Sequence, residues 1–217
     1  MGATHHASDQ PEWVASFFES ADQQRSAASM GMWLFLAQEI LFFSGLFMAY
    51  IAYRFLYPGT WLSGAEVLNK WMGAANTVVL LTSSLTMVLA IRDLQLNKTA
   101  SCVRWIWVTV GLAGMFLVVK AFEYAHKFHM GIFPGGHYEG GAVEGMAGIF
   151  FGIYYTATGL HALHVIIGMG LLGWLAVKVK NGSVTGENDV LAENLGLYWH
   201  LVDLVWIFLF PMLYLVK

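Results

Sequence analysis

Five long stretches of the chain are rich in apolar residues, and polar or turn-forming segments separate them. The stretches run from about residue 30 to 55, 71 to 91, 103 to 122, 146 to 177 and 194 to 216. A helix needs about 20 mainly apolar residues to cross a bilayer, so each stretch is long enough for one span. The separating segments contain the turn-forming runs Pro58-Gly59, Asn97-Lys98, Pro134-Gly135-Gly136 and Asn181-Gly182. The pattern therefore predicts an all-α, polytopic membrane protein with a five-transmembrane-helix bundle.

The regions outside these stretches are short and polar. Residues 1–29 mix acidic residues with Arg25 and lack the apolar core of a signal peptide. We expect a polar cytoplasmic N-terminal segment over residues 1–29 and one transmembrane domain over residues 30–217. The longest expected connection, about residues 124–145, is rich in glycine.

The composition agrees with lipid as the surrounding solvent. Of the 217 residues, 58% are apolar and only 12% are charged, which is about half the charged share of a soluble domain. With a formal net charge of −3, the chain lacks the basic excess that binds nucleic acid. A single cysteine, Cys102, excludes an internal disulfide and a thiolate metal site.

Basic residues are slightly more frequent on one side of the predicted spans. With the N-terminus in the cytoplasm, the inner side holds Arg25, Arg92, Lys98, Arg104, Lys178 and Lys180. Positive residues favour the cytoplasmic side, so we expect the N-terminus inside and, after five spans, the C-terminus outside.

Two local signals concern helix packing. Gly148 and Gly152 form a GxxxG motif in the fourth span, and such small residues let helix backbones approach closely. We expect this motif to pack inside the bundle. Pro211 in the fifth span predicts a kink or a frayed helix end.

Ionisable residues inside the spans are costly in lipid, so they need partners or a function. Five of them stand in the first, fourth and fifth spans: Glu39, His161, His164, His200 and Asp203. From the rise of about 1.5 Å per residue, Glu39 and Asp203 lie about 14 Å, and His164 about 18 Å, from the cytoplasmic ends of their spans. We expect these five residues to form a buried polar cluster that is structural or modulates proton uptake.

Glu123 and His126 form a second polar pair near the outer end of the third span, about 28 Å along it and beyond reach of the cluster. Glu123-x-x-His126 matches half of a di-iron carboxylate signature, whose other half is absent. Paired histidines can ligate haem b, although His161 and His164 stand one turn apart on one helix and cannot both ligate one iron axially. The favoured interpretation is hydrogen bonding between helices, so we predict no catalytic, cofactor-binding or metal-binding residue. Motifs of phosphate-binding loops, hydrolases and zinc proteases are absent from the sequence, as are the internal repeats of a transporter.

Several motifs match one known family in order and spacing. They are Glu39-x-x-Phe42-Phe43-x-Gly45-x-Phe47, Asn76-Thr77-x-x-Leu80-Leu81-x-Ser83-Ser84, Glu123-Tyr124, Thr156-Ala157-Thr158-Gly159-Leu160-His161-Ala162-Leu163-His164-Val165-Ile166-Ile167-Gly168 and Tyr198-Trp199-His200-Leu201-Val202-Asp203-Leu204-Val205-Trp206. From about Trp33 to Val216 the chain resembles subunit III of haem–copper terminal oxidases. The long form of that family has seven helices in two bundles divided by a lipid-filled cleft. This chain lacks the first two helices, so the cleft carries over only if a partner chain supplies its missing wall.

The resemblance implies an accessory core subunit of a proton-pumping respiratory oxidase in a bacterial inner membrane. It implies that haem and copper lie in partner subunits, and that this subunit stabilises subunit I and supports proton uptake while oxygen is reduced to water. Subunit I is the expected main contact, followed by subunit II and, in complexes that contain one, subunit IV. Bound phospholipid and membership of a respiratory supercomplex are further expectations.

The resemblance also bears on the electron donor. Glu39 matches the buried membrane glutamate of the family and favours a cytochrome c oxidase, since quinol-oxidase relatives can carry Asp there. Subunit III of a quinol oxidase stays an alternative. A haem b membrane anchor of a quinone-linked enzyme is an alternative from another class, and a small transporter is a third.

Overall fold

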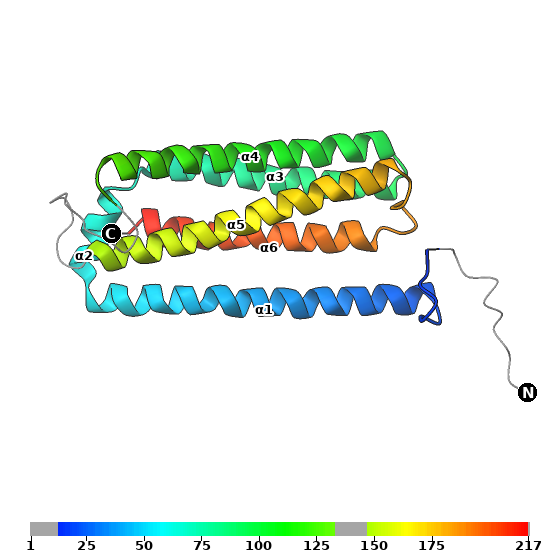
Figure 1. Cartoon of the computed structure of the whole chain (residues 1–217), viewed down its shortest axis with the longest axis horizontal. Helices are drawn as coiled ribbons and strands as arrows, with labels where there is room; N and C mark the ends of the chain where they lie inside the picture. Colours follow the sequence, from blue (N-terminus) through cyan, green and yellow to red (C-terminus); the bar gives the residue numbers. More distant parts are fainter. Residues whose placement is uncertain (1–12, 133–146, 217) are drawn as a thin grey trace, which may run out of the picture.

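The computed structural model describes residues 13–132 and 147–216 of the chain (Figure 1). These residues form five long helices and a short one, and contain no strand: α1 (Ala21–Leu56), α2 (Pro58–Glu66), α3 (Lys70–Gln95), α4 (Thr99–His129), α5 (Ala147–Lys180) and α6 (Val190–Tyr214). Each of the five long helices is long and apolar enough to cross a membrane. The predicted all-α bundle with five transmembrane helices is therefore confirmed.

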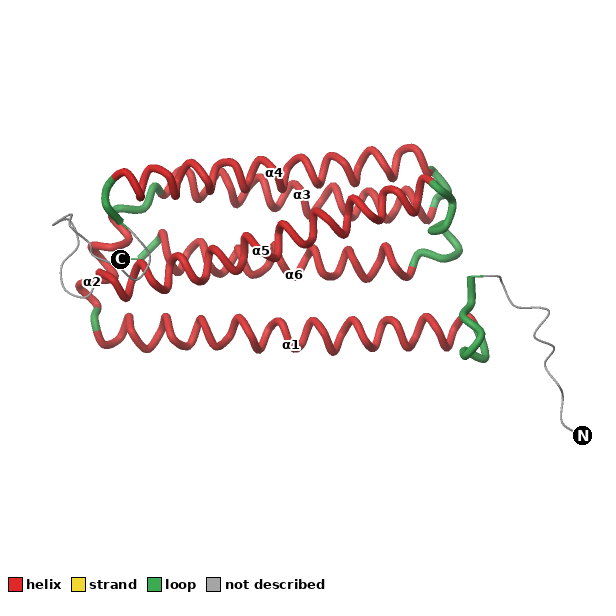
Figure 2. The backbone as a smooth tube through the Cα atoms, in the orientation of Figure 1, coloured by secondary structure: helices red, strands yellow, loops and turns green. Residues whose placement is uncertain are grey.

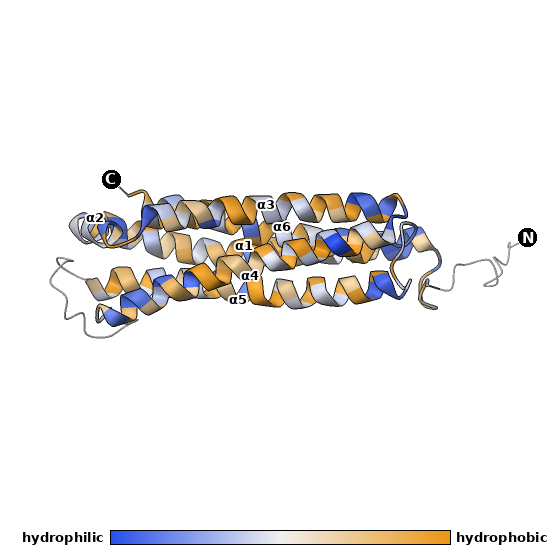
Figure 3. Ribbon diagram, turned by 90° about the horizontal axis from the view of Figure 1, so that it is seen from above, coloured by the Kyte–Doolittle hydropathy of each residue, from blue (hydrophilic) through white to orange (hydrophobic). Residues whose placement is uncertain are grey.

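The long helices run side by side along one axis, with α3 and α4 paired, α5 crossing beside α4 and α6, and α1 at an edge (Figures 1 and 2). Hydrophobic residues occupy most of the helix lengths, and hydrophilic residues gather toward the two ends (Figure 3). This distribution suits a bundle whose middle lies in lipid and whose ends reach the interfaces.

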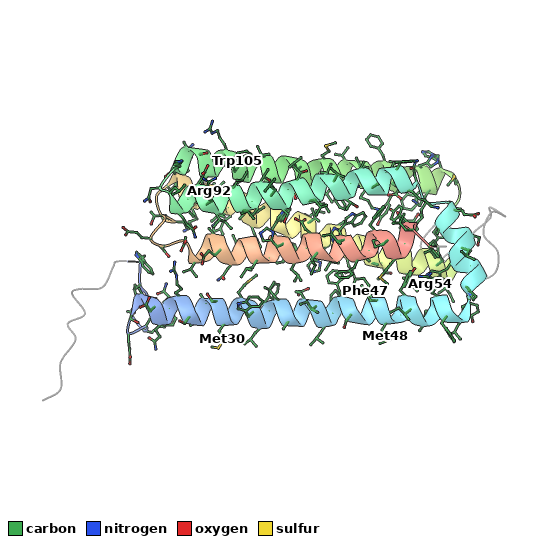
Figure 4. All side chains as sticks on the ribbon, turned by 180° about the vertical axis from the view of Figure 1, so that it is seen from behind. Met30, Phe47, Met48, Arg54, Arg92 and Trp105 are labelled. Atoms are coloured by element: carbon green, nitrogen blue, oxygen red, sulfur yellow. The ribbon has the colours of Figure 1, made fainter. Side chains whose placement is uncertain are left out.

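Helix α1 is attached to the rest of the bundle along one narrow stripe. Its buried residues are Leu36, Phe43 and Tyr50, which recur every seven residues and so lie on one face. Met30 and Met48 point away from the bundle, and both are largely exposed (Figure 4). Most of the α1 surface is therefore available to lipid or to another subunit.

The helices are longer than the predicted spans. Helix α1 begins at Ala21, capped by the Ser20 side chain, so the end of the segment expected to be a polar N-terminal region is helical. Helix α4 continues to His129, into the stretch expected to be a loop from residue 124. Apolar length marks the part of a helix that suits lipid, whereas the helix itself can continue into polar sequence.

Two proline positions bear on the expected helix ends. Pro58-Gly59 was predicted as a turn and instead begins α2, because proline fits the first turn of a helix, where its missing N–H has no partner. Pro211 lies inside α6, which continues to Tyr214. The predicted turn Pro134-Gly135-Gly136 lies outside the described residues, as does most of the glycine-rich connection.

Close helix packing depends on other glycines than the GxxxG motif. An added Cβ at Gly148 or Gly152 would meet nothing within 4 Å, so the predicted role of this motif inside the bundle is wrong. At Gly168 an added Cβ would lie 2.7 Å from the Trp199 ring, and at Gly64 it would lie 2.5 Å from the Phe150 ring. Gly73 is a third such position, where an added Cβ would lie 2.7 Å from the Phe210 ring, and these glycines let helices approach large aromatic side chains.

Candidate functional site

The first polar site joins α1 to α5. His164 Nε2 lies 3.0 Å from Glu39 Oε2, and the two side chains are only 15% and 13% exposed. The Phe43 and Phe42 rings lie beside the imidazole, with centroids 5.2 and 6.4 Å away. The sequence argument placed Glu39, His164 and Asp203 at similar depths in the membrane. In the structure, the first two of these residues are in contact.

The hydrogen bonds of His164 limit the charge of this pair. His164 Nδ1 lies 2.8 Å from the Leu160 carbonyl oxygen, which can only accept, so Nδ1 carries a proton. Nε2 then either accepts a hydrogen bond from a neutral Glu39 carboxyl group or donates one to an ionised Glu39 carboxylate. The pair is net neutral in both forms, which suits its place in the apolar part of the bundle.

The other three predicted residues do not join this pair. His200 Nδ1 lies 2.7 Å from Ser84 Oγ on α3. Neither carboxyl oxygen of Asp203 has a hydrogen-bond partner among the described residues, although the Ser84 hydroxyl lies close enough to interact with that group. His161 is fully buried, and both of its ring nitrogens lack a described partner.

Aromatic packing surrounds His161. Its ring lies edge to face with Phe116, at a centroid distance of 5.4 Å, and 5.2 Å from the Trp206 ring. Among the described contacts, Glu39 and His164 are thus the two cluster residues joined by a hydrogen bond, whereas His161 and Asp203 are buried in the bundle core.

A second polar site lies at the α2 end of the bundle, and its centre is Glu123. The carboxylate accepts hydrogen bonds from Lys120 at 2.9 Å, Lys127 at 2.7 Å, Tyr154 at 3.1 Å and Tyr214 at 2.7 and 2.9 Å. All five side chains are buried. Four helical positions on α4, α5 and α6 thus converge on one carboxylate.

Both lysines also lie over aromatic rings. Lys120 Nζ is 5.1 to 5.5 Å from the ring centroids of Tyr124, Tyr154, Trp206 and Tyr214. Lys127 Nζ is 4.8 Å from the Tyr154 centroid. Such contacts stabilise ammonium groups that have lost water.

The sequence argument predicted a Glu123–His126 pair and missed the lysines. No hydrogen bond joins Glu123 to His126 among the described contacts, although both side chains line one cavity at this end of the bundle. The available signal was spacing, because residues three and four apart meet on a helix surface and Glu123 has Lys120 and Lys127 at those distances. The predicted third span, which ends at residue 122, contained Lys120 but not Glu123 or Lys127.

The opposite end of the bundle has its own polar contacts. Arg25 at the start of α1 pairs with Asp189, which precedes α6. Gln95 at the end of α3 donates to Asp189 at 2.8 Å and to Glu193 at 3.2 Å. These contacts tie three helices together at that end.

None of these sites has the composition of a metal centre. The described residues contain no group of three or more His, Cys, Asp and Glu side chains that could hold a metal ion. Both ring nitrogens of His164 are engaged in hydrogen bonds, and His200 uses Nδ1. The arrangement suits helix attachment and proton sharing better than ligation.

Comparison with known proteins adds independent information. The family model for cytochrome c oxidase subunit III matches residues 19–217. A protein of Aeropyrum pernix named heme-copper oxidase subunit I+III is 33% identical over 97% of this chain, which spans 25% of that protein's length. A probable cytochrome c oxidase subunit 3 of Nocardia farcinica is 30% identical over 87% of this chain and 88% of its own length. Cytochrome c oxidase subunit 3 of Alkalihalophilus pseudofirmus is 29% identical over 96% of each protein.

Proposed function

Since the chain belongs to the cytochrome c oxidase subunit III family, we propose that it acts as the accessory subunit of a proton-pumping cytochrome c oxidase. In this role it stabilises subunit I and supports proton uptake into it while oxygen is reduced to water. Haem and copper then lie in the partner subunits, and the chain itself is not catalytic.

The Glu39–His164 pair is the observation that carries this proposal. It joins α1 to α5 through a net-neutral contact, with both ring nitrogens of His164 occupied. A pair of this kind holds a helix in place and offers no open ligand position. It therefore favours a structural role within a larger complex.

Subunit I is the proposed main partner. The fused relative carries subunits I and III in one name, which supports contact between the corresponding subunits of separate chains. The exposed apolar surface of α1 agrees with a membrane partner. Subunit II, subunit IV, membrane lipids including a bound phospholipid, and a supercomplex are further proposed partners.

We also propose a bacterial cytoplasmic membrane as the location. The N-terminus would lie in the cytoplasm and the C-terminus outside, as the basic residues at the α3–α4 and α5–α6 turns favour. The Glu39–His164 pair would then lie in the inner half of the bilayer.

Removing the chain tests the accessory role. We compare the oxidase from cells with and without this chain, measuring haem and copper per subunit I, proton uptake and thermal stability. Unchanged haem and copper with slower proton uptake and lower stability would support the proposal. Loss of a redox centre together with the chain would contradict it.

Cytochrome c is the proposed electron donor, and a quinol is the second candidate. The Nocardia and Alkalihalophilus relatives carry cytochrome c oxidase names, which favours the first. Oxygen consumption by the purified complex with reduced cytochrome c, and none with a quinol, is expected. The reverse pattern would establish the quinol alternative.

A haem b membrane anchor is a candidate from another class, and the geometry favours it less. His161 lies between aromatic rings, and His164 has no free ring nitrogen. A Soret band that survives purification of the chain and disappears in His161→Ala would favour the anchor.

A further inference from the structure

One ring nitrogen of His200 is free at the surface of the bundle, within the membrane-spanning part of α6. Nδ1 lies 2.7 Å from Ser84 Oγ, and Nε2 has no hydrogen-bond partner among the described residues. Nε2 is not one of the enclosed polar atoms either, and the side chain is half-buried, so this nitrogen reaches the surface. By contrast, Glu39 and His164 bond to each other, and the carboxyl oxygens of Asp203 are enclosed in the core.

The depth of His200 limits what can satisfy this nitrogen. The predicted fifth span begins near residue 194, so His200 lies about 9 Å inside it at the helical rise of about 1.5 Å per residue. In either neutral tautomer, Nε2 is an N–H donor or a lone-pair acceptor. Acyl chains carry no group that could bond to it, and an unpaired polar group in hydrocarbon is costly. The partner of Nε2 must therefore be a polar group that reaches this depth in the membrane.

The surface beside His200 is an apolar stripe of α6. Leu204, Ile207 and Phe208 follow His200 by four, seven and eight residues, so all four lie on one face of the helix. The three apolar side chains are 46%, 39% and 53% exposed. On this side of the bundle, α6 lies between α1 and α3, and it contacts both (Figure 4). A further helix packed against α6 here would cover three large apolar side chains and the free nitrogen together.

We propose that this α6 stripe, made of His200, Leu204, Ile207 and Phe208, is the docking surface for a membrane-spanning helix of another oxidase subunit. A hydroxyl, amide or carboxyl side chain of that helix hydrogen-bonds to His200 Nε2. The inference rests on the proposed function, because it takes the other oxidase subunits as the source of the helix. Lipid tails would cover the apolar side chains equally well, but they would leave Nε2 unpaired. The free ring nitrogen is therefore the feature that favours a polar helix as the occupant.

Photo-crosslinking in native membranes tests which molecule covers the stripe. A benzophenone amino acid replaces Leu204, one helical turn from His200, and mass spectrometry identifies what it captures. We expect capture of a spanning helix of another oxidase subunit. Capture of lipid alone, or of a second copy of this chain, while subunit I still co-purifies would overturn this inference and leave the proposed function standing. Absence of every oxidase subunit from the purified chain would overturn the proposed function, and this inference with it.

Two substitutions of His200 separate the roles of its two ring nitrogens. Asn places its amide near the position of Nδ1 and has no group at the position of Nε2, whereas Gln reaches the position of Nε2. We expect His200→Asn to raise the fraction of the chain released from the complex in mild detergent about three- to tenfold, as for the loss of one hydrogen bond between membrane helices. His200→Gln should raise it less than about twofold. Equal release of the two variants would overturn the proposal.

The thermal midpoint of the full chain, measured after dissociation from its partners, separates docking from folding. His200→Asn keeps an amide beside Ser84, so its midpoint should stay close to that of the unchanged chain. His129→Leu is the matched control, because His129 is exposed at the end of α4 and should affect neither release nor midpoint. A midpoint of His200→Asn lowered enough to explain its release would mean that His200 acts only within this chain, and would overturn the proposal.

Discussion

Glu39 faces His164 across the contact of α1 with α5, where few water molecules can replace a lost partner. Glu39→Gln keeps a side-chain donor for His164 Nε2, whereas Glu39→Leu removes it. We expect the Gln variant to assemble, turn over and pump protons almost normally, and the Leu variant to release the subunit more easily. The measurement is the fraction of complexes that retain this chain in mild detergent.

Proton pumping separates this structural role from a direct one. If Glu39 relays protons, the Gln variant would assemble fully and yet pump markedly fewer protons per electron. His164→Ala is a useful companion, since it leaves Glu39 unpaired at a cost of roughly 1–3 kcal/mol. It should weaken subunit retention and leave haem and copper content unchanged.

The Glu123 carboxylate is the counter-charge of two buried ammonium groups, those of Lys120 and Lys127. Glu123→Gln leaves Lys120 and Lys127 without a counter-charge, at an expected cost of about 3–5 kcal/mol. We expect a strongly lowered thermal midpoint of the chain in detergent. Glu187→Gln, at an exposed position between α5 and α6, should leave the midpoint nearly unchanged. Similar midpoints for both variants would contradict the proposed charge balance.

Contacts between individual residues could be predicted where the depth of each residue along its span was enough to place it. Counting the rise along each span placed Glu39 and His164 at similar depth, and they meet. The same count placed Asp203 there too, but depth does not say which face of a helix a residue occupies. Lys120 and Lys127 were missed because apolar length does not show which polar residues near a span end are covered by other helices, and both lysines are buried.

Single helices differ in how much their packing tolerates an added methyl group. Gly168→Ala places a Cβ 2.7 Å from the Trp199 ring, so we expect a loss of about 1–3 kcal/mol. Gly170→Ala on the same helix meets nothing within 4 Å and should be neutral or stabilise by up to about 1 kcal/mol. Thermal midpoints of the two variants check this difference, which equal midpoints would refute.

The type and number of the long helices followed from apolar length, but their ends and their contacts did not. Ser20 caps α1 well before its apolar part begins, and α4 continues through a polar turn beyond it. The GxxxG motif was assigned to internal packing although the motif itself does not specify a partner. Gly168 makes that approach, because Trp199 lies opposite it.

The whole molecule has a simple test of its proposed orientation. With the N-terminus in the cytoplasm, a reporter fused at Asn97, between α3 and α4, should lie inside. A reporter fused at Pro134, which follows α4, should lie outside. An inside signal at Pro134 would mean that the orientation is inverted.

The family could be identified from the sequence because its motifs are long and occur in order. The contacts that the chain makes with other subunits could not be predicted from the sequence. Helix α1 buries one stripe and leaves most of its apolar surface exposed. What covers that surface depends on other chains, and no pattern within this sequence specifies them.

Affinity purification through a tag on this chain tests the central claim most directly. From native membranes in mild detergent, we expect oxidase subunits I and II to elute in equimolar amounts with the chain. Haem and copper should follow those partners when the complex is dissociated. Elution without subunit I, or haem that stays with the isolated chain, would contradict the account.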